Sequence, residues 1–88
     1  MAWRIELTET ANKQLAKLDK IEARRITKFL RERLAALDNP RHTGKALSGP
    51  LGGLWRYRVG DYRLICEIQE GVLCVLVLKI GNRREVYK

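Results

Sequence analysis

The chain has 88 residues, which is enough for a single domain over 1–88 with one modest core. Lysine and arginine total 18 against 10 for aspartate and glutamate, and this net charge of +8 favours a polyanionic partner such as nucleic acid, an acidic membrane surface or an acidic protein. The longest apolar run, 72–78, is far too short to span a membrane, and the charged opening residues predict no signal peptide, so we expect a cytoplasmic protein.

A strand is predicted at the start of the chain, because Trp3, Ile5 and Leu7 alternate with charged residues. Thr8 or Thr10 suits the N-cap of the helix that follows. The apolar residues of that helix recur at helical spacing on one face, at Ala11, Leu15 and Leu18.

A second, longer helix is predicted over 20–37, after Asp19. Asn39-Pro40 ends it, because the residue before a proline resists helical angles. Its other face is basic, which fits either a solvated surface or a secondary contact to nucleic acid. Its apolar stripe consists of Ile26, Phe29, Leu30, Leu34 and Leu37.

The stretch 40–53 reads as a long loop, and loops of this length are usually functional or mobile. His42 has no carboxylate beside it in the sequence, so we expect a solvated loop residue and not a catalyst. Cys66 and Cys74 lie in strand-like runs and are expected to pack as small hydrophobes. We expect no disulfide framework and no metal site.

A β-hairpin is predicted over 54–66, with its two-residue turn at Gly60-Asp61. This turn places Arg58 opposite Arg63, and like charges in that position destabilise a strand pair. An anionic ligand explains the arrangement, and phosphate is the best geometric match to guanidinium groups. The predicted apolar face holds Trp55, Tyr57, Val59, Tyr62, Leu64 and Cys66, and the other face holds Arg56, Arg58 and Arg63.

The remaining residues predict a central strand over 72–80, apolar on both sides, a break at 81–84 and a short edge strand at 85–88. Both helices lie in one stretch of the chain, so they should cover one face of the sheet. The predicted class is α+β, with two N-terminal helices packed on one face of a small, mostly antiparallel four- to five-stranded sheet. The arginines would then lie on the opposite face.

Two stretches carry a resemblance to a known family. Residues 44–65 resemble the central signature of the RelE toxin family, and residues 80–87 resemble its terminal signature. The resemblance implies a RelE-like fold and a toxin of a type II toxin–antitoxin pair in the RelE/ParE superfamily. RelE-like toxins enter the ribosomal A site and cleave mRNA without a metal ion or other cofactor, whereas the ParE branch inhibits DNA gyrase.

The resemblance also implies a site. Tyr87 would act as general base or as a base-stacking platform, Arg63 would hold the scissile phosphate, and Arg83 or a hairpin arginine would stabilise the leaving oxygen. Arginine is a poor proton donor, so the pair on the first hairpin strand fits phosphate binding better than general-acid catalysis. The implied catalytic residues are Arg56, Arg58, Arg63, Arg83 and Tyr87, and the implied RNA-binding residues are Arg56, Arg58, Lys45 and Arg84.

The functional hypothesis that follows is a ribosome-dependent, metal-independent mRNA endonuclease that inhibits translation. Its expected partners are the ribosome, mRNA and a small acidic RelB-like antitoxin, in a heterotetramer or a higher complex. One alternative is a ParE-like gyrase inhibitor without nuclease activity. Another is an inactive scaffold or repressor partner that only binds antitoxin and operator.

Overall fold

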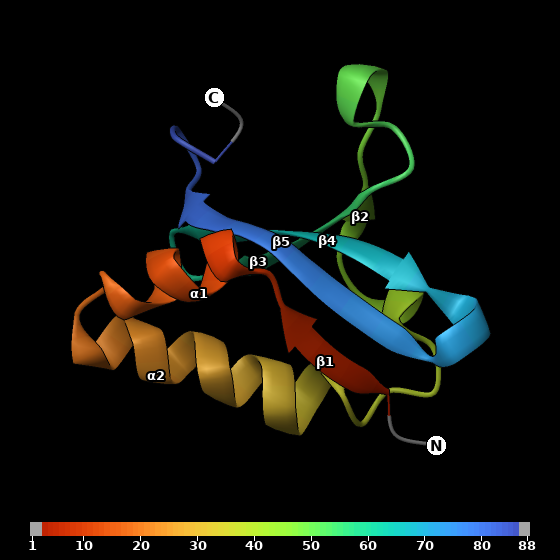
Figure 1. Ribbon diagram of the computed structural model, residues 1–88, viewed down its shortest axis with the longest axis horizontal. Helices are drawn as coiled ribbons and strands as arrows, with labels where there is room; N and C mark the ends of the chain where they lie inside the picture. Colours follow the sequence, from red (N-terminus) through yellow and green to blue (C-terminus); the bar gives the residue numbers. More distant parts are fainter. Residues whose placement is uncertain (1–2, 87–88) are drawn as a thin grey trace.

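A five-stranded sheet forms the centre of the computed structural model, which describes residues 3–86 (Figure 1). The strand order is β1-β5-β4-β3-β2, in which β1 and β5 are parallel and every other pair is antiparallel. The sheet is therefore mostly antiparallel, as predicted. The strands are β1 (Arg4–Leu7), β2 (Lys45–Ala46), β3 (Trp55–Val59), β4 (Tyr62–Gln69) and β5 (Cys74–Asn82).

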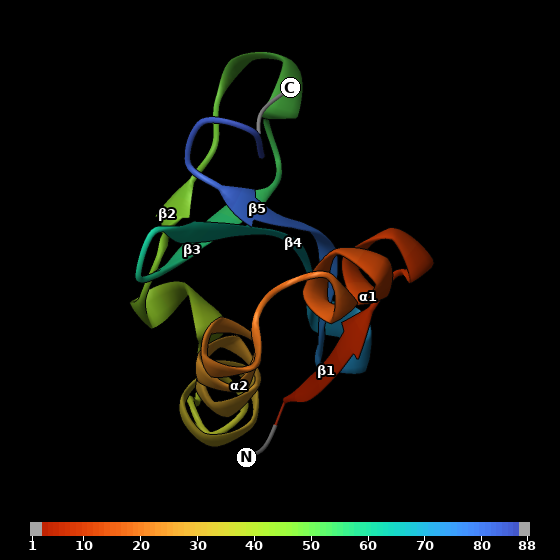
Figure 2. The ribbon, with the colours of Figure 1, turned by 90° about the vertical axis from the view of Figure 1, so that its left-hand side faces the viewer.

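Both helices lie on the same face of this sheet, while the segment after β2 and the turn after β5 extend from the other (Figure 2). Helix α1 spans Glu9–Ala16, and the Thr8 hydroxyl caps it by accepting a hydrogen bond from the Ala11 N–H at 3.1 Å. Helix α2 spans Lys20–Lys28 and continues as a π-helical segment, Phe29–Leu34. The α+β prediction is confirmed, although this second helical stretch ends earlier than expected.

The hydrophobic core fills the space between the helices and the sheet. Trp55 and Tyr62 are partly buried and pack against it, so the predicted apolar face of the hairpin is confirmed. No helix within residues 3–86 is long and apolar enough to cross a bilayer. The buried core residues include Ile26, Leu30, Leu34, Tyr57, Val59, Leu64, Cys66, Val75, Val77 and Ile80.

The edges of the sheet differ from the prediction. The expected loop 40–53 contains β2, which pairs with β3 and forms one edge of the sheet. The final strand expected over 85–88 is wrong for its first two residues, because Glu85 and Val86 lie in a turn. That turn is closed by the Asn82 side chain, whose Oδ1 accepts hydrogen bonds from two successive backbone N–H groups. Tyr87 and Lys88 lie outside the described residues.

Candidate nucleic-acid interface

The hairpin strands direct their arginines to the face of the sheet opposite the helices, called here the open face. Arg58 lies directly opposite Arg63, and Val59 lies opposite Tyr62, as the turn at Gly60-Asp61 predicted. Val59 is buried in the helix-side core, and successive side chains of a strand point to opposite faces. The alternation therefore places Arg58 and Arg63 together on the open face.

Arg63 is held firmly by the hairpin turn. Only 8% of the surface of this residue is exposed, and its Nη1 donates hydrogen bonds to the carbonyl oxygens of Gly60 at 3.3 Å and Tyr62 at 3.1 Å. A guanidinium has several N–H donors in a fixed plane, so one nitrogen can bind the turn while the group still faces a ligand. Arg58, by contrast, is exposed.

A second row of side chains crosses the open face beside the first. Arg56 lies opposite Ile65, and Ile65 lies opposite Lys79 on β5. The Nε of Arg56 is buried and has no hydrogen-bond partner among the described residues. A buried N–H group without an acceptor is costly, so this atom is suited to an acceptor supplied by a ligand.

Lys79 is a site candidate that sequence reasoning missed. The stretch 72–80 reads as apolar on both sides, so its single lysine carries no periodic signal of its own. Its neighbour Ile80 is in the helix-side core, so Lys79 points to the open face. Only the pairing of Lys79 with Ile65 reveals that it shares this face with the arginines.

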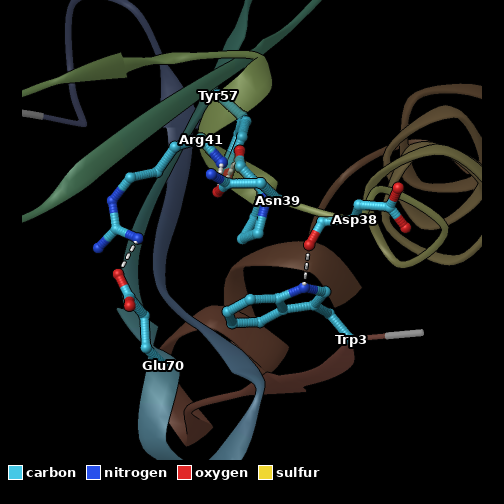
Figure 3. Close-up of polar contacts among 7 residues, drawn as sticks. Trp3, Asp38, Asn39, Arg41, Tyr57 and Glu70 are labelled. Carbon is cyan, nitrogen blue, oxygen red and sulfur yellow. Dashed lines mark hydrogen bonds and ion pairs between the residues drawn. The ribbon is translucent and has the colours of Figure 1, made fainter. Parts of the chain in front are cut away.

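The segment before β2 is anchored against β3 by two aromatic side chains. The Tyr57 hydroxyl donates to the Pro40 carbonyl at 2.7 Å, and Trp55 Nε1 donates to the Thr43 carbonyl at 2.8 Å. Burial raises the pKa of Tyr57, which keeps its hydroxyl protonated as a donor. Figure 3 shows Tyr57 above this segment, and also the ion pair between Arg41 and Glu70 that ties the segment to the end of β4.

Gly44 lets this segment approach β3 closely. Its φ is +78°, and a Cβ there would lie 2.5 Å from the carbonyl oxygen of Arg56. Lys45 follows and pairs with Arg56, so the structure brings Lys45, Arg56 and Arg58 together at one cleft of about 180 Å³. The cleft is lined by Phe29, Thr43, Gly44, Lys45, Arg56, Tyr57 and Arg58.

A larger cleft of about 360 Å³ adjoins this one, between α2 and the hairpin turn. Arg58 and Phe29 line both clefts, so the two clefts meet at these residues. Arg25 is paired there with Glu22 at 3.7 Å. The cations along this cleft are Arg25, Lys28, Arg33 and Arg58.

The turn after β5 brings two more arginines beside the hairpin. The Arg83 N–H donates to the carbonyl of Asp61 at 3.2 Å, and both Arg83 and Arg84 are exposed. Val86 packs against Gly81, where a Cβ would lie 3.3 Å from that of Val86. Gly81 is opposite Arg63, so the turn folds over the open face. Tyr87, the remaining catalytic candidate, lies outside the described residues.

Four arginines of the site have no ion pair with a carboxylate of the described residues. The ion pairs found between residues 3 and 86 involve Arg4, Lys13, Arg25 and Arg41, and none involves Arg56, Arg58, Arg83 or Arg84. Those four arginines therefore present their charge to solvent or to a ligand. The same described region contains no group of three or more histidine, cysteine or carboxylate side chains placed to hold a metal ion.

The other polar candidates are structural or peripheral. Cys66 and Cys74 are both buried and free, and burial raises the pKa of each thiol, so the prediction that they pack inside the protein is confirmed. His42 is exposed at the end of a short 3-10 turn, Pro40–His42, in agreement with its expected role as a solvated residue.

Comparison with known proteins agrees with this geometry. Residues 5–87 match the profile of a family described as the ParE toxin of type II toxin–antitoxin systems. Toxin RelE of Mycobacterium tuberculosis is 33% identical over 98% of this chain and 87% of its own length. Toxin RelG of the same organism is 28% identical over 100% of this chain and 99% of its own length.

Solved structures show the same fold. The toxin–antitoxin complex RelBE2 of Mycobacterium tuberculosis contains a chain that superposes with a TM-score of 0.86 at 28% identity, covering 94% of this chain and 100% of that one. A chain of the archaeal RelE–RelB complex of Pyrococcus horikoshii superposes with a TM-score of 0.73 at 29% identity, covering 97% of this chain and 99% of that one. The protein therefore belongs to the RelE family of toxins, within the RelE/ParE superfamily of type II toxin–antitoxin systems.

Proposed function

We propose that the protein is a ribosome-dependent endonuclease that cleaves mRNA in the A site, without a metal ion, and so inhibits translation. The observation that carries the proposal is a set of four arginines on and beside the open face, Arg56, Arg58, Arg83 and Arg84, that no carboxylate among the described residues neutralises. The proposed catalytic residues are Arg56, Arg58, Arg63, Arg83 and Tyr87, and Lys45 and Arg84 add contacts to the RNA backbone.

The proposed reaction is an internal transesterification of RNA. A base removes the proton of the ribose 2′-hydroxyl, and the 2′-oxygen attacks the adjacent phosphorus. The bond from phosphorus to the 5′-oxygen breaks, and that oxygen takes up a proton. The products are a 2′,3′-cyclic phosphate and a 5′-hydroxyl. Negative charge builds on the phosphoryl oxygens in the transition state, where fixed guanidinium groups stabilise it.

The contacts of each arginine suit a separate role. Arg63 is oriented by the hairpin turn, so it is the best placed group to hold the scissile phosphate in a fixed position. Arg56 offers its buried Nε to a phosphoryl oxygen. Arg58 and Arg83 are exposed and would close around the RNA as it binds. Tyr87 is the proposed base, since cations close to a tyrosine favour its phenolate.

Mapping of cleavage sites in cells tests the proposal. The protein is induced briefly in a bacterium, and transcripts are examined by primer extension while amino-acid incorporation is followed. Cuts within translated codons, together with arrested incorporation, are the expected result. Normal incorporation during growth arrest would defeat the endonuclease proposal.

A small acidic antitoxin is the proposed partner. The related chains from Mycobacterium tuberculosis and Pyrococcus horikoshii were solved in toxin–antitoxin complexes. A RelB-like chain with excess carboxylates would complement the net charge of +8 and cover the open face. Co-expression with the gene next to this one should yield a heterotetramer or a higher complex, measurable by light scattering, and should restore growth.

Gyrase inhibition is the alternative function. The description of the matching family as a ParE toxin favours it, since ParE-like toxins share the fold. Accumulation of double-strand DNA breaks after induction, without cuts in mRNA, would support this alternative. Breaks that appear only after translation has stopped would not.

A further inference from the structure

Lys79 places an ammonium group on the open face next to the proposed catalytic arginines. Lys79 and Arg56 lie two strand spacings apart, so about 10 Å separates their Cα atoms. Arg63 is the diagonal neighbour of Lys79 on β4, about 7–8 Å away between Cα atoms. Lysine and arginine side chains are long enough to meet at one phosphate across these separations. Lys79 is partly exposed, so its stem is accessible from the open side of the sheet.

Most cations of the site are arginines, which are poor proton donors for the leaving group, and the other lysine of the site, Lys45, lies on β2 at the edge of the sheet. Arg56 and Arg58 occupy the basic positions of the first hairpin strand, and a guanidinium effectively never releases its proton. An ammonium group donates readily by comparison, and its protonation is adjustable by the environment. Lys79 is the lysine of β5, the strand that also leads directly into the Arg83 turn.

We propose that Lys79 is the general acid of the cleavage reaction. This inference rests on the proposed endonuclease function. As the bond between phosphorus and the 5′-oxygen breaks, the electron pair of that bond moves to the oxygen. Lys79 Nζ gives one proton to the oxygen, which leaves as a hydroxyl, and the neutral amine then regains a proton from water. The proton of the 2′-hydroxyl leaves separately, through the base.

A substrate with a better leaving group isolates this proton transfer. Programmed ribosomes are prepared with normal mRNA and with mRNA in which sulfur replaces the 5′-bridging oxygen at the cleavage site. A thiolate leaves without protonation, so the sulfur substrate does not need a general acid. Single-turnover rates are measured for the wild type, Lys79→Ala and Lys79→Arg. Lys17→Ala, at the exposed C-terminal end of α1 on the opposite face of the sheet, removes the same charge and is the matched control.

On normal mRNA, the single-turnover cleavage rates of Lys79→Ala and Lys79→Arg should both be at least about 100-fold lower than that of the wild type, because general acid catalysis contributes that much or more. On the sulfur substrate both should cleave close to the wild-type rate, which also shows that the variants are folded and bind ribosomes. The control should match the wild type on both substrates.

Other results overturn the proposal. A Lys79→Arg rate near that of the wild type on normal mRNA would mean that charge alone matters. An equal loss on both substrates would assign Lys79 a binding or structural role. If the wild type itself fails to cleave either substrate, the endonuclease function fails, which is a different result from normal cleavage by the Lys79 variants.

Discussion

Arg58 and Arg63 face each other across β3 and β4, but their surroundings differ. Arg63 is almost buried and binds two carbonyl oxygens of the hairpin turn, whereas Arg58 is exposed and lines two clefts. Two like charges in register would repel each other without a counter-charge. The hairpin tolerates them because the carbonyl dipoles of the turn solvate Arg63 while water solvates Arg58. A bound phosphate would then lie between one fixed and one adjustable cation.

Removal of the fixed cation should abolish most of the catalysis. Arg63→Ala should reduce single-turnover cleavage of mRNA on ribosomes by at least about 100-fold, the scale of losing one preorganised oxyanion donor. Arg63→Lys should also be impaired, because an ammonium cannot reproduce the planar fork of donors. Cleavage by Arg63→Ala at the wild-type rate would place the phosphate anchor elsewhere. Circular dichroism checks that the variant keeps its hairpin.

Chelation of metals should leave the reaction intact. The proposed chemistry uses only side chains, so cleavage should persist in excess EDTA when polyamines keep the ribosomes assembled. The rate is followed by gel analysis of labelled mRNA, with magnesium restored in a parallel sample as the control. A strict requirement for an added transition metal would contradict the proposed mechanism.

The hairpin and its arginine pair were predictable because local rules determine them. Gly60-Asp61 selects a two-residue turn, and that turn determines which residues of the two strands are partners. A slip by one residue would put every apolar side chain of the hairpin in water. The positions of Arg58 and Arg63 on one face therefore follow from the sequence alone, and the structure agrees.

Lys79, β2 and the final turn depend on contacts that no local pattern describes. The face of Lys79 follows from a register shift between Ile65 and Cys66 in the pairing with β5. The strand Lys45–Ala46 is too short for a periodic signal and exists because β3 offers it a partner. Glu85 and Val86 do not form the expected strand, because the Asn82 side chain supplies the hydrogen bonds that close a turn instead.

Gly44 should be essential for the placement of Lys45. Gly44→Ala combines a left-handed backbone, costing about 1–2 kcal/mol, with a contact of 2.5 Å to the Arg56 carbonyl that forces the segment away from β3. Gly49→Ala is the matched control, since its φ of +67° carries the same strain but nothing lies within 4 Å of the new Cβ. Urea unfolding should show a larger loss of stability for Gly44→Ala than for Gly49→Ala, and the rate of mRNA cleavage by Gly44→Ala should fall too. Equal losses of stability in the two variants would show that the close approach is not important.

Stability should decline above about pH 8.5, the range in which an unperturbed thiol ionises. Burial raises the pKa of Cys66, so the folded state keeps this proton while the unfolded chain releases it. The stabilisation is complete below the unfolded pKa and is lost as the pH rises towards the folded value, by about 1.4 kcal/mol per pH unit for each such group. Urea unfolding from pH 7 to pH 10 under reducing conditions measures this slope.

Cys66→Ala separates the thiol from the other groups that titrate in this range. The variant loses some stability at every pH because of its smaller side chain, and that loss is constant with pH. Its slope between about pH 9 and pH 10 should be shallower than that of the wild type by roughly 1.4 kcal/mol per pH unit. Cys74 remains in the variant, and burial raises its pKa as well, so a residual slope is expected. Identical slopes for the two proteins would mean that the Cys66 thiol ionises equally in the folded and unfolded states, against its position in the core.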